Sequence, residues 1–200
     1  MIVDASQLIG HKSIDLSQNH ADALCAPGHK GLFGIQGSGI LVLKDNNIEP
    51  LLYGGSGTES KNDKMPQNLP ERLEAGTLNA PAIVSLRAGI DTILNYELEF
   101  IEYRLKKLSM LFKERLYSIN DLEIFSESNG IISFRSSRST PSEIDNLLTA
   151  RSICVRSGFH CAPLAHKTLG TFNNGLVRVS LSVFNTPSDA DALYKALKSI

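Results

Sequence analysis

Short apolar runs separated by glycine-rich turns occupy the front of the chain. Uninterrupted runs of this length are typical of buried strands. We therefore predict strands at residues 1–5, 21–26 and 39–43. The following segment, 54–81, is polar and rich in Gly, Ser and Asn. A loop of that length inside a compact domain is usually functional or disordered.

From Ala82 onward the apolar positions recur every three or four residues, which is the period of an amphipathic helix. The clearest stripe comprises Leu98, Ile101, Leu105, Leu108, Phe112 and Leu116. Acidic and basic side chains fill the remaining positions. We interpret this charged face as solvated and not as a binding patch.

After Ser118 short strands and helices alternate. Strands are predicted at residues 122–125, 131–134, 152–156 and 176–181. Capping boxes at Thr140–Glu143 and Thr186–Asp189 each carry Pro at the first helical position. They predict helices that end at Leu148 and Ile200. We place a domain boundary near Ile119, giving units 1–118 and 119–200 in an α/β protein.

Composition and charge exclude several classes of protein. The chain has 200 residues, is 42% hydrophobic and 20% charged, and carries a net charge of -1. This balance allows a sizeable core and implies no nucleic-acid or anionic-membrane surface. Three cysteines without framework spacing favour a reducing compartment. No run reaches transmembrane length and the N-terminus lacks signal-peptide features. We expect a soluble cytoplasmic protein.

One candidate site combines Asp4 with Lys30, each at the end of a predicted strand. Lys30 lies in a glycine-rich segment, APGHKGLFGIQGSG, where the backbone can approach a ligand closely. A desolvated lysine forms Schiff bases, and an acid commonly pairs with the pyridine nitrogen of pyridoxal phosphate. Taken singly, Lys30 reads as a surface lysine and Asp4 as a turn residue or helix cap.

A second candidate site is the segment 156–163, RSGFHCAP. Neighbouring cationic groups lower the pKa of a cysteine, and Arg156 and His160 are close enough in sequence to act on Cys161. Cys25 and Cys154 lie inside predicted apolar strands, so we interpret them as buried and inert. A zinc set of Cys154, His160, Cys161 and His166 is disfavoured, since it matches no usual zinc spacing. We predict no metal site.

Arg178 stands alone among apolar strand residues. A buried arginine needs an anionic partner, because an unpaired buried charge is costly. Capture of a substrate carboxylate and structural pairing with Asp or Glu are both open readings.

Five motifs together resemble a known family. They are VDASQ, GHKG, RLEAGTLN, VRSGFHCAPLAHKTLGT and VRVSLSVFNT, in that order. They resemble the cysteine desulfurase and selenocysteine lyase branch of the class V aminotransferases, which are fold-type-I pyridoxal phosphate enzymes. The resemblance covers essentially the whole chain. It implies part of the large mixed-sheet domain followed by a smaller α+β domain that carries the cysteine loop.

The resemblance also implies roles for individual residues. Lys30 would form the Schiff base with pyridoxal 5'-phosphate, and Cys161 would be the sulfur-accepting nucleophile. Asp4 would bind the pyridine nitrogen, Gln7 the ring hydroxyl, and His29 the phosphate end. Gly76 and Thr77 would reach the phosphate of the other subunit of a homodimer. Arg178 would bind the substrate carboxylate, with Arg156 and His160 beside it.

The implied reaction converts L-cysteine to alanine and leaves a persulfide on Cys161; selenocysteine is the alternative substrate. The persulfide would pass to a sulfur-acceptor protein, for instance in iron–sulfur assembly. Two departures stand out. Pro27 replaces the family's usual Ser or Thr, and the family's N-terminal half, with its main phosphate-binding loop, is absent. A non-catalytic fragment and another class V lyase or aminotransferase are therefore the alternatives. We expect the isolated chain to self-associate through exposed sheet edges.

Overall fold

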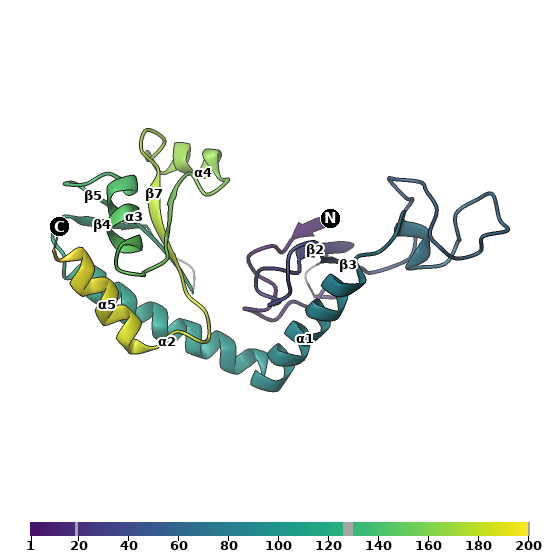
Figure 1. The fold of residues 1–200 in the computed structure, drawn as a ribbon, viewed down its shortest axis with the longest axis horizontal. Coiled ribbons are helices and arrows are strands. Elements are labelled where there is room, and N and C mark those ends of the chain that lie inside the picture. Colours follow the sequence, from purple (N-terminus) through teal and green to yellow (C-terminus); the bar gives the residue numbers. More distant parts are fainter. Residues whose placement is uncertain (19, 126–129, 200) are drawn as a thin grey trace. The chain divides into compact units, whose positions relative to one another are not determined.

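The computed structural model describes residues 1–18, 20–125 and 130–199. The chain divides into two compact units, Met1–Glu99 and Phe100–Ile200 (Figure 1). Within the described ranges, none of the helices combines the length and apolar character needed to cross a membrane. Each unit has its own sheet and is described separately below.

The first unit contains a three-stranded sheet in the order β1-β2-β3. Its strands are β1 (Ile2–Asp4), β2 (Ala23–Pro27) and β3 (Gly39–Leu43), close to the predicted runs. β1 pairs with β2 in parallel, and β3 pairs with β2 in antiparallel orientation. The loops that follow β1 and β2 therefore leave the same edge of the sheet.

Helix α1 (Ala80–Tyr96) supports the loop that follows β2. Asn79 caps the helix by accepting a hydrogen bond from the Ala82 backbone N–H at 3.2 Å. At Gly89 a Cβ atom would collide with the carbonyl of Leu32, so the helix backbone lies directly against this loop. Within the polar segment before α1, a short 3-10 helix, η1 (Glu71–Leu73), is present.

The predicted helical stripe belongs to a second helix, α2 (Leu98–Tyr117), which is separate from α1. The break falls at Glu97, whose φ of 63° is incompatible with a continuous α-helix. The first unit ends at Glu99 and the second begins at Phe100, whereas the sequence predicted a boundary near Ile119. The difference arises because α2 packs with the second unit: Ser109 accepts a hydrogen bond from Gly130 N–H at 2.7 Å.

The second unit is an antiparallel sheet in the order β4-β5-β7-β6. The strands are β4 (Leu122–Phe125), β5 (Ile131–Ser136), β6 (Arg156–Gly158) and β7 (Leu176–Ser180). Helices α2 and α5 (Pro187–Leu197) run side by side beneath the sheet, joined by an Arg115–Asp191 ion pair (Figure 1). The core between these layers includes Ile132, Phe134 and Val177.

Both capping boxes are confirmed, at the start of α3 (Pro141–Thr149) and of α5. The predicted strand 152–156 is wrong. Ser152 has a φ of 58°, and Ile153 N–H bonds back to the Leu148 carbonyl at 2.9 Å, so these residues complete the turn after α3. β6 therefore begins only at Arg156. The last helix ends at Leu197, and its predicted end, Ile200, lies outside the described residues. Helix α4 (Pro163–Thr168) was not predicted.

Candidate active site

Asp4 and Lys30 lie on the same edge of the first sheet, as the sequence predicted. Asp4 is the last residue of β1 and is in register with Cys25 of the parallel neighbour β2. Hydrogen bonds from the Ser6 hydroxyl and from the Ser6 backbone N–H (2.9 Å) lower the pKa of the Asp4 carboxyl. The positive charge of Lys30 lowers it further. The edge thus presents a stable carboxylate and an exposed amine.

The loop that carries His29 and Lys30 is held by its own backbone. Gly28 N–H donates to the Ser38 carbonyl and Gly34 N–H to the Gly28 carbonyl, both at 2.8 Å. At Gly31 a Cβ atom would strike the carbonyl of Ile9 in the turn after β1. Glycine is therefore required where the two loops touch, and the close approach fixes His29 and Lys30 relative to the β1 turn.

Gln7, Gly76 and Thr77 complete the predicted cofactor set in the first unit, and all three are exposed. Gln7 lies in the turn after β1, in which Leu8 N–H donates to the Ala5 carbonyl at 2.9 Å. Gly76 adopts a φ of 97° in the segment before α1, and its N–H bonds to the Gly55 carbonyl at 2.7 Å. Thr77 follows it directly, so this pair lies outside the loops that hold Lys30.

Cys161 is exposed in the second unit, on the short connection between β6 and α4. Its φ is 60° and that of His160 is 52°, so two consecutive residues with side chains adopt the left-handed conformation. Such conformations cost of order 1–3 kcal/mol each and persist only where the surroundings enforce them. His160 Nε2 lies 3.0 Å from the Arg156 carbonyl oxygen, which ties this turn to β6.

Arg178 on β7 faces the Cys161 connection. It is half-buried, and its Nε is buried without a hydrogen-bond partner in the described part of the chain. Burial lowers the pKa of its guanidinium, Arg156 opposite it on β6 lowers it further, and the negative charge of Cys161 raises it. Among the residues described, no Asp or Glu forms an ion pair with Arg178. Of the two readings of this arginine, structural pairing is therefore not observed.

The surroundings of His160 lower the pKa of its ring. Burial is the main cause that lowers its pKa below the ordinary value of 6.5, and the positive charge of Arg178 adds to it. This shift opposes protonation of the ring, and the sequence-based interpretation that His160 acts on Cys161 stays a prediction. The cations that surround the Cys161 connection are the guanidinium groups of Arg178 and Arg156.

The pKa of His160 predicts a pH dependence of stability. At pH values between the pKa of His160 in the folded state and its higher pKa in the unfolded state, the unfolded state binds more protons. The free energy of unfolding therefore rises with pH in this range. We expect stability to fall as pH drops below about 6.5, and His160→Gln to make this fall shallower. Urea unfolding at about pH 7 and about pH 5 tests this. An identical pH dependence in both proteins contradicts the assignment.

The sequence matches the family model "Aminotransferase class-V" over residues 1–193. The chain belongs to this family. Among its relatives, a protein named "Probable cysteine desulfurase" from Methanothermobacter thermautotrophicus is 33% identical over 100% of the chain, and one of the same name from Pyrococcus abyssi is 32% identical. The chain spans about half the length of these class-V relatives, 52% and 51% respectively.

Solved structures of class-V cysteine desulfurases share the fold. The apo enzyme from Thermococcus onnurineus superposes with a TM-score of 0.89 at 33% identity, over 99% of this chain and 51% of the other. The Escherichia coli enzyme CsdA gives 0.90 at 28% identity, over 99% and 50%. The predicted α/β fold class is confirmed. Class-V aminotransferases and cysteine desulfurases are pyridoxal phosphate enzymes.

The other two cysteines are less buried than the sequence predicted. Cys25 lies in β2 as predicted but is only half-buried, and its thiol donates to the Val3 carbonyl at 3.7 Å. Cys154 is exposed and lies before β6, in a segment that is not a strand. Across the described ranges, no group of three or more His, Cys, Asp or Glu residues is placed to hold a metal ion.

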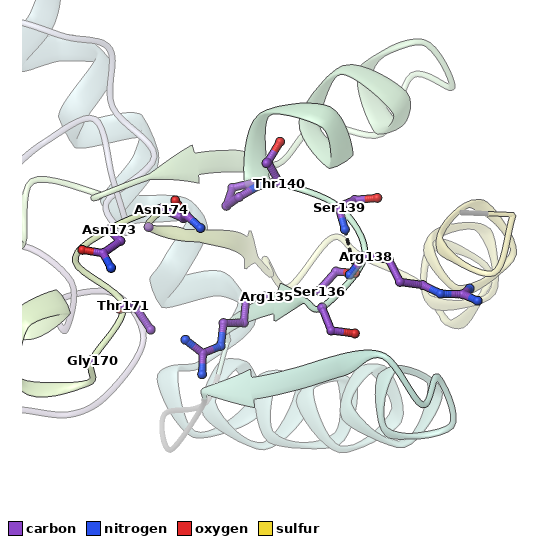
Figure 2. Close-up of a pocket in the computed structure, with 12 residues that line it drawn as sticks. Arg135, Ser136, Arg138, Ser139, Thr140, Gly170, Thr171, Asn173 and Asn174 are labelled. Carbon is purple, nitrogen blue, oxygen red and sulfur yellow. Dashed lines mark hydrogen bonds between the residues drawn. The ribbon is translucent and has the colours of Figure 1, made fainter.

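A polar cavity of about 280 Å³ lies in the second unit, away from Cys161. One wall is the segment from Arg135 to Pro141 at the end of β5, and the other is the loop from Gly170 to Gly175 (Figure 2). Thr171 in this wall is buried, and its hydroxyl lies 2.8 Å from Nδ1 of His166. The cavity wall is thereby connected to α4.

Sequence reasoning missed His166 and Thr171 as a pair. It weighed His166 only as a zinc ligand and did not single out Thr171. The available signal was Pro163 followed by His166 and Lys167, because Pro at a first helical position and basic residues in the last turn mark a short helix. That helix places His166 beside the Cys161 connection.

Proposed function

We propose that this chain carries the lysine and cysteine centres of a pyridoxal-phosphate-dependent cysteine desulfurase. The observation that carries the proposal is the exposed Cys161 held in a left-handed turn beside Arg178, whose buried Nε lacks a partner in the described structure. A thiol nucleophile next to an unpaired cation suits a substrate that offers both a carboxylate and a sulfur atom. The similarity to cysteine desulfurases supports the same reading.

The residues of the first unit fit pyridoxal phosphate chemically. Lys30 offers an exposed amine for a carbonyl, and Asp4 offers a carboxylate whose lowered pKa keeps it charged. When bound, the cofactor supplies an electron sink for carbanion chemistry. Asp4 would hold a proton at the pyridine nitrogen, Gln7 the ring hydroxyl, and His29 the phosphate end. Gly76 and Thr77 would contact the phosphate held by the second subunit of a homodimer.

The remaining roles follow from the side chains themselves. Lys30, once free, would take the proton from the substrate α-carbon as a general base. The Cys161 thiolate would attack the substrate sulfur and form an S–S bond as the carbon–sulfur bond breaks. The electron pair of that bond goes to the substrate carbon, which takes up a proton and leaves as alanine. The sulfur stays on Cys161 as a persulfide, a reversible thiol modification.

Substrate and partners follow from this chemistry. L-cysteine is the proposed substrate and L-selenocysteine the alternative, since both present the carboxylate that Arg178, Arg156 and His160 would bind. A persulfide must be discharged onto another thiol, so we propose a sulfur-acceptor protein, with iron–sulfur assembly as the pathway served. Free thiols on the chain fit a reducing compartment, for which we propose the cytoplasm.

Replacing Arg178 tests the substrate assignment. We expect Arg178→Gln to raise the KM for cysteine about 10- to 100-fold, because a charge-assisted hydrogen bond contributes roughly 1.5–3 kcal/mol. Alanine formation from cysteine with excess pyridoxal phosphate is the assay. The matched control is Arg138→Gln, because Arg138 is an exposed arginine at the separate cavity. This variant should leave the KM unchanged. No alanine from the unaltered chain, or an unchanged KM in Arg178→Gln, contradicts the proposal.

A further inference from the structure

The turn that carries Cys161 needs an external support. Its own backbone supplies one hydrogen bond, from Ala162 N–H to the Phe159 carbonyl at 2.8 Å. His160 and Cys161 both have positive φ, and neither is glycine. Residues in this region are held there by surrounding structure.

His166 is a buried group whose ring packs against this turn. Only 3% of its surface is exposed, although it lies on a short helix whose other residues are exposed. Its ring and the ring of Phe159 form a T-shaped pair with a centroid distance of 5.3 Å and an interplanar angle of 84°. The ring of His160 lies 5.8 Å from it on the same turn. His166 therefore contacts the residues on the N-terminal side of Cys161.

Thr171 fixes the orientation of His166. Its backbone N–H donates to the His166 carbonyl at 2.9 Å, and its hydroxyl lies 2.8 Å from Nδ1 of the ring. The Thr171 carbonyl accepts from Gly175 N–H at 2.9 Å. At Gly175 a Cβ atom would come within 2.6 Å of the Gly158 carbonyl group, so this loop lies directly on the end of β6. Figure 2 shows Thr171 on its loop beside Gly170 and Asn173.

These contacts form a closed support around the turn. The chain leaves β6 at Gly158, passes through Cys161 into α4, and returns through Thr171 to Gly175, which packs on Gly158. The hydrogen bond between His166 and Thr171 is buried and links α4 to the loop that follows it. Two apolar residues could fill such an interior at no cost in stability. A hydrogen-bonded pair instead selects one ring orientation.

We propose that His166 and Thr171 form a positioning pair that holds Cys161 next to Arg178. The role of Cys161 as nucleophile rests on the proposed function, whereas the positioning itself is a property of this turn. His166 acts through the rings of Phe159 and His160 and does not touch the thiol in this role. Without the pair, the left-handed turn relaxes and the thiol moves away from the guanidinium of Arg178.

The test measures where Cys161 lies, without cofactor or substrate. In a Cys25→Ser, Cys154→Ser background, Cys161 is the single thiol, and its alkylation rates with iodoacetate and iodoacetamide are compared. Both reagents attack the same thiolate, so the ratio of their rates cancels the thiolate fraction. A nearby guanidinium favours the anionic reagent, and this preference weakens with salt. Arg178→Gln in the same background should remove the preference and so identifies its source.

Thr171→Val removes the hydroxyl at nearly constant shape, and Thr171→Ser restores it. We expect Thr171→Val to lower the iodoacetate-to-iodoacetamide ratio at least about threefold and Thr171→Ser to return it to the original value. A merely structural hydroxyl would lower the free energy of unfolding and leave this ratio unchanged. An unchanged ratio in folded Thr171→Val overturns the proposal, as does a ratio that Thr171→Ser does not restore.

A second pair of variants applies if Thr171→Val does not fold. His166→Asn places an amide near the position of Nδ1 and can keep the bond to Thr171, whereas His166→Gln places it near Nε2. The alkylation ratio should be higher in His166→Asn than in His166→Gln, and equal ratios contradict the proposal. Failure of cysteine turnover alone would overturn the proposed function and leave this result standing.

Discussion

Replacing Cys161 with alanine is expected to abolish sulfur release from cysteine. The substitution removes the only atom proposed to form a bond with the substrate sulfur. Loss of a covalent nucleophile typically lowers turnover by at least about 10³-fold. The assay follows persulfide on the protein together with alanine formation, with excess pyridoxal phosphate.

Cys154→Ala is the matched control for this prediction. Cys154 is also an exposed free thiol of the second unit, but it precedes β6 and lies outside the left-handed turn. It should keep full activity. The same pair of variants separates the alternatives within the family, since transamination needs no thiol. If Cys161→Ala loses sulfur release while Cys154→Ala behaves like the unaltered chain, the site is a desulfurase site; a Cys161→Ala variant that keeps its activity by transamination contradicts this assignment.

Lys30→Ala is expected to produce the second large loss. Lys30 is proposed to bind the cofactor carbonyl and then to move the proton at the substrate α-carbon, and general-base catalysis alone contributes about 10²–10⁴-fold. Exchange of the cysteine α-hydrogen with deuterated water measures this step apart from sulfur transfer. We expect exchange to be lost in Lys30→Ala and retained in Cys161→Ala.

Lys44→Ala is the control that removes one positive charge elsewhere on the same sheet. Lys44 is exposed and directly follows β3 of the same sheet, so its loss changes the net charge without touching the loop after β2. Exchange should continue at the unaltered rate. Equal losses in the Lys30 and Lys44 variants would mean that general electrostatics, and not a specific base, controls the reaction.

The first sheet and the placement of Asp4 and Lys30 at one edge of it were predictable because local signals and topology agree there. Apolar runs of strand length lie on both sides of Asp4 and Lys30, and parallel pairing of β1 with β2 brings the two following loops to one edge. The capping boxes before α3 and α5 were equally readable, since the bonding pattern of such a box is local in sequence. The resemblance to family motifs then suggested a role for each residue but did not predict the geometry of the site.

Features that depend on long-range packing were not predictable from the pattern. The apolar run 152–156 has the composition of a strand, but backbone bonds to the end of α3 keep Ser152 and Ile153 in a turn. The assignment of α2 to the second unit depends on what its stripe packs against, which periodicity does not specify. The burial of His160, which lowers its pKa, likewise follows from its tertiary neighbours.

The most direct test of the central claim is to locate the Schiff base chemically. The chain is incubated with excess pyridoxal phosphate, reduced with borohydride, digested, and the modified lysine identified by mass spectrometry. The account predicts that the label accumulates on Lys30 well ahead of exposed lysines such as Lys44 and Lys61. Labelling spread evenly over the exposed lysines, with no preference for Lys30, would contradict it.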